Sequence, residues 1–235
     1  MKLAVVQSNY VPWPGYFQII LNADLVCIYD DIQYTKNDWR NRNQIMSADG
    51  PRWLTVPVHG STLQNINTVR IVPSNRWQKK HLLSIYHCYS SYPKFDILKD
   101  FLDEFYERQD WIFLSELNTK IISYITDEIF GRKIDFVSSK SIAPQLSGKH
   151  RLLALIRHFN ADTYLSGPAV FNYCKGEDFE SEEINLQIAK YDYNEFGRVF
   201  KGQIYSLSIL DLICRYGYDS KTRLIGEDKF VSWKK

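Results

Sequence analysis

The sequence lacks the long apolar segments that a membrane-spanning or exported chain carries. No apolar run approaches the roughly 20 residues that a transmembrane helix needs. Leu3 to Val6 is the apolar run that precedes Gln7, and it is too short for the apolar region of a signal peptide. We therefore expect a cytoplasmic protein without a transmembrane segment.

Paired cysteines are also missing. The four cysteines are irregularly spaced and form no CxxC pair, which argues against a zinc site. Because disulfides need an oxidising compartment and the sequence shows no sign of export, we expect reduced and buried thiols. The histidines are scattered, so the sequence predicts no metal site. The cysteines are Cys27, Cys88, Cys174 and Cys214.

Basic tracts and the common nucleotide motifs are absent too. The formal net charge is +2, and the densest basic spots are Lys79-Lys80 and the pair Arg40 and Arg42, so a nucleic-acid partner is not expected. The chain has no GxGxxG, no GxxxxGK[ST] and no GxSxG. A dinucleotide fingerprint, a P-loop and a nucleophile elbow are therefore excluded.

Aromatic residues, by contrast, are abundant. They make up 15% of a chain that is 45% hydrophobic, which indicates an ordered globular protein. The first thirty residues predict a strand at Leu3 to Val6, a helix from Pro14 over 15–23 and a strand at 25–29. Two apolar strands separated by one helix are typical of a parallel βαβ unit.

The rest of the chain continues this alternation. Residues 33–45 are polar and predict a loop, and Pro57 places the strand around it at an edge or strand end. Further strands are predicted at 53–58, 69–72, 136–137 and 184–188, and residues 161–167 predict a strand followed by a loop. Helices are predicted at 77–89, 95–106, 115–129, 152–159 and 206–217. We expect a single α/β domain over 1–235 with a mostly parallel sheet flanked by helices. A helical segment at about 75–130 would form an insertion or lid.

Ligands of open α/β sheets bind beyond the carboxyl ends of the strands, where several polar clusters fall. The first is the rigid aromatic turn QSNYVPWPGYF, which is either one wall of a small-molecule site or a hydrophobic plug. Ser166 and Gly167 follow another predicted strand. The turn's candidate binding residues are Gln7, Asn9, Tyr10, Trp13, Gly15 and Tyr16.

Charged residues follow the same strand ends. Asp30 and Asp31 are consecutive, so in an extended chain they point to opposite faces and at most one enters a cleft. That one could act as a general base, or both could be a cap or surface pair. In WRNRN, Arg40 and Arg42 could clamp a phosphate beside Asn41 and Asn43, or the segment could be a solvated loop. Lys149 and Arg151 stand near a predicted helix N-terminus, which favours anions.

These segments together resemble the WbqC-like proteins of bacteria. The turn is similar to the family pattern QPxYxPWxGYF, and the acidic strand end continues into YDDIQYTKNDWRNRNQI, which adds Gln33 and Tyr34 to the candidate site. WLTVPV, YLSGPA and LSILDLICRYG also match, so the resemblance covers residues 3 to about 217. Val6 stands where many members carry His or Met, and Ser8 where Pro is common.

The resemblance implies a role in surface-polysaccharide or O-antigen biosynthesis. It implies modification of an activated, nucleotide-linked amino sugar. Our leading hypothesis for the reaction is a transferase that moves an acyl or aminoacyl group, with Asp30 or Asp31 as the catalytic base. The alternative is a non-catalytic protein that binds a sugar nucleotide in the same pathway. A glycosyltransferase would be expected to show DxD, which is missing here. The cofactor is left open, because no motif supports ATP or coenzyme A, and a homodimer is compatible with the sequence.

The N-terminal layout is also similar to the nucleotidyltransferase-like fold of pantothenate synthetases. In that fold an HxGH signature holds ATP phosphates at a helix N-terminus. Trp13 and Tyr16 stand where the two histidines would be. The likeness is therefore an analogy at the level of the fold.

Overall fold

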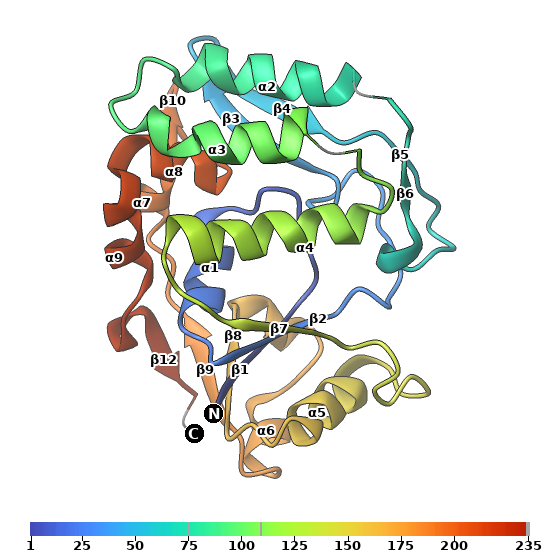
Figure 1. Cartoon of the computed structure of the whole chain (residues 1–235). Coiled ribbons are helices and arrows are strands. Elements are labelled where there is room, and N and C mark those ends of the chain that lie inside the picture. Colours follow the sequence, from blue (N-terminus) through green and yellow to red (C-terminus); the bar gives the residue numbers. More distant parts are fainter. Residues whose placement is uncertain (75, 109, 234–235) are drawn as a thin grey trace.

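A six-stranded sheet forms the centre of the protein (Figure 1). The computed structural model describes residues 1–74, 76–108 and 110–233. The strand order is β12-β9-β8-β1-β2-β7, and every pairing is parallel except that of β12 with β9. The prediction of an α/β protein with a mostly parallel sheet is confirmed. The strands are β1 (Lys2–Val6), β2 (Leu25–Ile28), β7 (Asp135–Ser138), β8 (Thr163–Ser166), β9 (Asn185–Ala189) and β12 (Phe230–Ser232).

Helices cover both faces of the sheet because successive side chains of a strand point to opposite sides. Ala4 and Val26 pack on one face in the cluster that contains α1 (Pro14–Leu21). Leu3 and Cys27 pack on the other face with α5 (Gly148–His158) and α6 (Gly176–Glu180). Figure 1 shows the sheet between these two groups of helices.

The chain reverses its direction across the sheet next to β1. It runs from β1 through β2 to β7, then crosses back to β8 on the other side of β1 and continues to β9. The connections that leave β1 and β8 therefore cover opposite faces. Such a reversal opens a crevice at the carboxyl ends of the neighbouring strands, which is where α/β proteins bind ligands.

The predicted helical segment is present. It contains α2 (Arg76–Tyr89), α3 (Lys99–Leu102) with a π turn at Asp103–Glu107, and α4 (Leu114–Tyr124) with a π turn at Ile125–Ile129. These helices lie above α1 in Figure 1. Their apolar residues share one core cluster with α1 and with the C-terminal helices α8 (Ile209–Tyr216) and α9 (Ser220–Leu224).

Three small hairpins were predicted only in part. The pairs are β3 (Arg42–Ser47) with β4 (Gly50–Thr55), β5 (Val58–His59) with β6 (Arg70–Ile71), and β10 (Gly197–Phe200) with β11 (Gln203–Ser206). The loop predicted over 33–45 is wrong from Arg42 onward, because this polar stretch pairs with the next strand. The strand predicted at 53–58 instead begins at Gly50 and ends at Thr55, ahead of Pro57.

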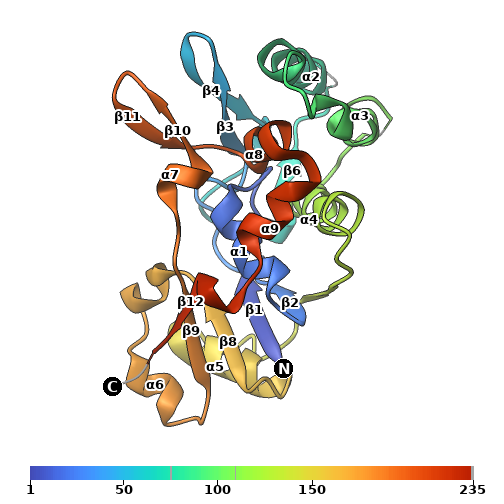
Figure 2. The same cartoon turned by 90° about the vertical axis from the view of Figure 1, so that its left-hand side faces the viewer.

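Hairpins β3–β4 and β10–β11 project from the same end of the molecule (Figure 2). The Phe200 ring lies against Gly50, where a Cβ would come within 2.8 Å of it, and Ser208 N–H donates to the Gln44 carbonyl at 2.8 Å. The short helix α7 (Tyr193–Phe196) precedes β10. The remaining short helical turns are at Ile66–Thr68, Phe95–Leu98, Pro168–Asn172, Gly217–Asp219 and Glu227–Lys229.

All four cysteines are free, as expected. Cys27, Cys174 and Cys214 are buried and Cys88 is half-buried. In the described part of the chain, no helix is both long and apolar enough to traverse a bilayer.

Candidate functional site

A cavity of about 470 Å³ lies at the carboxyl ends of β1 and β2, on the face covered by α5. Such a volume is within the range that small-molecule sites occupy. The described residues that line it offer amides, tyrosine hydroxyls and one cation, but no carboxylate, imidazole or thiol. They are Val5, Val6, Gln7, Asn9, Tyr16, Tyr29, Ile32, Arg40, Gly148, Leu152, Tyr164 and Tyr173.

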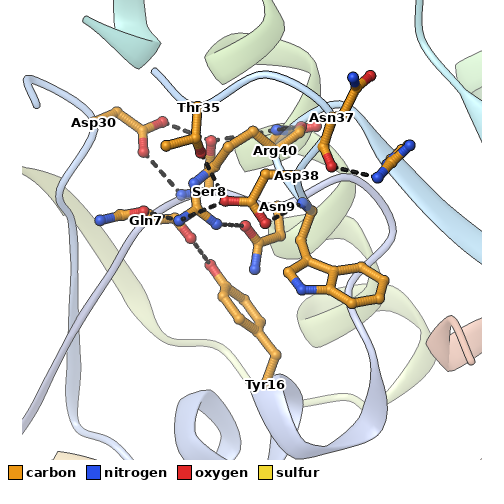
Figure 3. A network of polar contacts seen from close by, with 12 residues as sticks. Gln7, Ser8, Asn9, Tyr16, Asp30, Thr35, Asn37, Asp38 and Arg40 are labelled. Atoms are coloured by element: carbon orange, nitrogen blue, oxygen red, sulfur yellow. Dashed lines mark hydrogen bonds and ion pairs between the residues drawn. The ribbon is translucent and has the colours of Figure 1, made fainter. Parts of the chain in front are cut away.

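Arg40 is the cation of this cavity. Its guanidinium donates to the side-chain oxygens of Gln7 and Asn9, which follow β1 (Figure 3). Both partners are neutral, and the carboxylate of Asp38 is 3.8 Å away. The side chain is only 15% exposed, so water screens its charge poorly. Asp38 offsets part of the charge of Arg40, but the guanidinium, which neutral amides hold in place, remains a suitable anchor for an anion.

The loop that carries Arg40 is held by neighbouring backbone and amide groups. The Asn118 side chain of α4 donates to the Arg40 carbonyl at 2.8 Å, and Tyr10 N–H donates to the Trp39 carbonyl at 2.9 Å. Asn41 donates through its side chain to the Val56 carbonyl at 3.0 Å. Arg40 is therefore placed by the fold and not by a ligand.

Asp30 and Asp31 point to opposite sides of the sheet, as their consecutive positions predict. Asp30 faces α4, where it accepts from Ser8 N–H at 2.8 Å, the Ser8 hydroxyl at 2.6 Å and the Ser115 hydroxyl. Burial raises the pKa of Asp30, while the bonds from Ser115 and Ser8 oppose the shift. This carboxyl is 3% exposed and is not among the cavity's lining residues.

Asp31 faces α5. It pairs with the guanidinium of Arg151 and accepts from the Ser139 hydroxyl. The same guanidinium lies over the ring of Tyr29, 5.0 Å from its centroid. Its neighbours in the sequence, Tyr29 and Ile32, line the cavity, but Asp31, like Asp30, is not among the lining residues. Arg151 is committed to this pair and is not an unpaired anion site.

The N-terminus of α5 reaches the cavity through Gly148 and Leu152. Its N-cap residue, Ser147, makes no side-chain cap, and the positive end of the helix dipole favours anions. Lys149, which was predicted beside Arg151, instead pairs with Asp178 of α6 at 2.8 Å. The anion-favouring groups around this cavity are therefore Arg40 and the α5 N-terminus.

Tyrosines supply the polar atoms of the remaining wall. The Tyr16 hydroxyl donates to the Gln7 carbonyl at 2.9 Å. Burial raises the pKa of Tyr16, Tyr29, Tyr164 and Tyr173, so these hydroxyls stay protonated at neutral pH. The Tyr16 hydroxyl can accept a hydrogen bond from a ligand, the other three can also donate, and none carries negative charge.

Several predicted site residues have structural contacts away from this cavity. Tyr10 is buried beside His81, with 2.8 Å between its hydroxyl and Nδ1. Gly15 leaves room for the Trp13 ring, because a Cβ would come within 2.4 Å of it. Gly167 similarly accommodates the Tyr191 hydroxyl.

The remaining predicted residues belong to the loop and hairpin that follow β2. Gln33 bridges to Asn65, and buried Tyr34 packs beside Gly60. Arg42 lies over the Trp53 ring, 4.3 Å from its centroid. The Asn43 amide donates to the Val11 carbonyl at 2.8 Å. Ser166, the last residue of β8, is buried.

The structure thus brings Gln7, Asn9, Tyr16 and Arg40 together around one cavity. Sequence reasoning missed Tyr29, which follows β2, Tyr164, which lies within β8, and Tyr173, which follows the helical turn Pro168–Asn172. For Tyr29, its position directly after an apolar strand was the available signal. Across the described residues, no group of three His, Cys, Asp or Glu side chains could hold a metal ion.

Comparisons with known proteins match most of the chain, including the residues around the cavity. A family model described as the WbqC-like protein family matches residues 7–223. The chain is 34% identical over 222 residues to the uncharacterized protein Rv1507c of Mycobacterium tuberculosis (strain ATCC 25618 / H37Rv), which is 93% of this chain and 95% of that protein. No solved structure matches significantly. The matched region contains all lining residues of the cavity except Val5 and Val6.

Proposed function

The chain belongs to the WbqC-like protein family, and on that premise we propose that it modifies a nucleotide-linked amino sugar in surface-polysaccharide biosynthesis. Family membership supports a role in polysaccharide biosynthesis. The proposed activity is transfer of an acyl or aminoacyl group to the amine of the sugar. Both the substrate class and the transfer reaction belong to this proposal.

The observation that carries the proposal is Arg40 in the cavity wall. A nucleotide-linked sugar contains a diphosphate, whose oxygens accept charge-assisted hydrogen bonds from a guanidinium. Arg40 is held by two neutral amides, and its ion-pair partner among the described residues, Asp38, lies near the outer limit of ion-pair distance, at 3.8 Å. The N-terminus of α5 adds a favourable dipole, and neutral tyrosines offer donors for sugar hydroxyls.

The proposed step joins an amine to an activated acyl group. The amine nitrogen attacks the carbonyl carbon, a carbon–nitrogen bond forms, and the bond to the leaving thiolate or phosphate breaks with its electron pair. One proton leaves the nitrogen and must be taken up by a base. The acyl donor is a thioester or acyl phosphate supplied from solution, so coenzyme A esters belong among the compounds to test. ATP belongs there together with a carboxylic acid, which it would convert to an acyl phosphate with release of ADP.

Asp31 is the better candidate of the two predicted bases. It faces α5, which contributes to the cavity wall, although it is paired with Arg151 and does not line the cavity itself, whereas Asp30 faces α4 and holds Ser8 in place. We expect Asp31→Asn to lower turnover by about 10²-fold or more, as loss of a general base does. Turnover assays of Asp31→Asn and Asp30→Asn test this assignment, which fails if Asp31→Asn keeps full activity.

A thermal-shift panel tests the binding proposal. It would hold several nucleotide-linked amino sugars, ATP and coenzyme A, and a ligand at about 100 times its Kd should stabilise the native state by about 2.7 kcal/mol. That corresponds to a rise in Tm of roughly 5–10 °C for a protein of this size. Arg40→Gln should weaken binding roughly 10- to 100-fold, since charged hydrogen bonds contribute about 1.5–3 kcal/mol. Exposed Arg76 provides a matched control, Arg76→Gln.

One observation favours a second function, a protein that binds a sugar nucleotide without catalysis. The described lining residues include no carboxylate, imidazole or thiol, the groups that most often carry out acid–base or nucleophilic catalysis. Binding that depends on Arg40, together with no product from any acyl donor in the panel, would favour this second function. If no sugar nucleotide shifts the wild-type Tm at millimolar concentration, both functions are wrong.

A further inference from the structure

A second hollow of about 270 Å³ adjoins the cavity, and we call it the aromatic groove. Three separate segments line it: the N-terminal turn, the loop before β3, and the region from α7 to β11. Its lining residues are Asn9, Trp13, Trp39, Tyr193 and Ser206. These residues are uncharged, and three of the five are aromatic, unlike the residues around Arg40.

The aromatic rings of the groove are open to solvent but held in place from behind. Trp39 is 43% exposed and Tyr193 is 53% exposed. Trp39 leans on Trp53, with 5.7 Å between the ring centroids, and Tyr191 packs edge-on against Trp13 at 4.7 Å. Large rings that are buttressed on one side and exposed on the other form a stacking surface for a ligand.

The geometry of the walls favours a flat ligand. The rings of Trp13 and Tyr193 are within 13° of parallel, with centroids 5.9 Å apart. Tyr193 sits on a helix of only four residues and is more than half exposed, so ring surface beside Trp13 is open to a planar ligand. A nucleobase presents such a π face, and stacking on aromatic side chains tolerates any base.

Asn9 joins the groove to the cavity, because it lines both. Its side-chain oxygen accepts from Arg40, and Figure 3 shows the amide nitrogen directed away from that contact. This nitrogen has no hydrogen-bond partner within the described ranges and is available for the edge of a base. The Ser206 hydroxyl offers a second donor or acceptor at the groove.

We infer that the aromatic groove binds the nucleobase of the nucleotide-linked sugar. The base stacks against Trp13, Trp39 and Tyr193, the diphosphate contacts Arg40, and the sugar occupies the 470 Å³ cavity. This inference rests on the proposed function and gives the substrate an orientation. It also explains why an uncharged aromatic hollow adjoins a fixed cation.

Isothermal titration calorimetry with UDP, dTDP, GDP and inorganic pyrophosphate separates the base from the phosphates. Wild type should bind at least one nucleoside diphosphate more tightly than pyrophosphate. Tyr193→Leu and Trp39→Leu should each weaken that nucleoside diphosphate roughly 5- to 100-fold, the usual range for one stacked ring, and leave pyrophosphate unchanged. Arg40→Gln should weaken both ligands.

Two further variants keep the test specific. Tyr193→Phe retains the ring and should bind like wild type, and Tyr218→Leu removes a ring that is 62% exposed at another site. Nucleoside diphosphates that bind no better than pyrophosphate, or that are indifferent to Tyr193→Leu and Trp39→Leu, would overturn the inference. Arg40-dependent binding of a sugar nucleotide would then leave the proposed function standing. The inference would also be overturned if Tyr193→Leu and Trp39→Leu weakened the binding of a base-free sugar phosphate.

Discussion

At the scale of single residues, Asp30 organises the site without lining it. Its carboxyl accepts from the Ser8 backbone and from the Ser8 and Ser115 hydroxyls. Ser8 lies between Gln7 and Asn9, which hold Arg40. A buried carboxylate on α4's side of the sheet therefore fixes the cation on the cavity side.

Replacing Asp30 with alanine should cost stability. The substitution leaves a fully buried backbone N–H of Ser8 without its acceptor, and a buried unsatisfied donor costs about 1–3 kcal/mol. Urea unfolding at pH 7 measures the change, with Asp135→Ala of exposed β7 as the matched control. A loss no larger than that of Asp135→Ala would show that Asp30 does not hold this turn.

The sequence predicted part of this residue-level arrangement. Gln7, Asn9, Tyr16 and Arg40 were identified because polar groups at strand ends are candidates for ligand contact. Tyr193 was missed because it is far from these residues in the chain and stands in no apolar pattern. Which distant aromatic ring faces Trp13 is decided by tertiary packing, and that cannot be read from spacing.

At the scale of elements, a buried polar chain ties four segments together. The Tyr10 hydroxyl lies 2.8 Å from His81 Nδ1 and 2.6 Å from the Tyr106 hydroxyl, and the Thr55 backbone also hydrogen-bonds His81. These residues come from the N-terminal turn, α2, the π turn after α3, and β4. The chain connects the helical segment to the loop and hairpin beside the site.

Stability should depend on pH through His81. Burial lowers the pKa of His81 to about 4, whereas the unfolded ring titrates near 6.5. Between these values the unfolded chain binds more protons, so stability falls as pH falls through this window, by up to roughly 3 kcal/mol in total. Urea unfolding between pH 7 and 4.5 should show this loss in wild type.

The matched variant is His81→Phe, which should remove this part of the pH dependence. Its stability at pH 7 should be lower, because the Tyr10 hydroxyl loses a partner, but its slope between pH 6.5 and 5 should be flatter. The raised pKa of Asp30 acts in the opposite direction and is shared by both proteins. Equal slopes in the two proteins would contradict the assignment to His81.

Element predictions succeeded where apolar patterning was strong. The βαβ unit at the N-terminus and the helices near 77–89 and 115–129 bury apolar residues at the expected period. β3 was missed because RNQIMS is mostly polar and shows no strand pattern. Its antiparallel pairing with β4 makes it a strand. β12 was missed because three residues give no period, and its antiparallel pairing with β9 defines it.

At the scale of the whole molecule, one apolar core joins the start, middle and end of the chain. Phe17 of α1, Ile85 of α2, Ile121 of α4 and Ile213 of α8 belong to the same buried cluster. The segment at 75–130 therefore shares its apolar contacts with the sheet and with the C-terminal helices. If this segment acts as an insertion or a lid, it does so while its apolar residues remain part of the shared core.

Calorimetric unfolding should accordingly give a single transition, with van't Hoff and calorimetric enthalpies that agree. The physical reason is that the helical segment cannot unfold without exposing the core face of α1. Differential scanning calorimetry at two scan rates measures the transition. Two resolved peaks, or a van't Hoff enthalpy well above or below the calorimetric one, would contradict a single cooperative domain over 1–235.

The central claim is that Arg40 anchors the diphosphate of a sugar nucleotide between the cavity and the aromatic groove. A crystal structure with the sugar nucleotide that shifts Tm most tests it directly. The expected result is phosphate oxygens within about 3 Å of the Arg40 guanidinium, a usual charge-assisted hydrogen-bond distance. The base should lie beside Trp13, and the sugar should lie in the cavity that Tyr164 lines. A ligand bound elsewhere, or phosphates that leave Arg40 bonded only to Gln7 and Asn9, would contradict the claim.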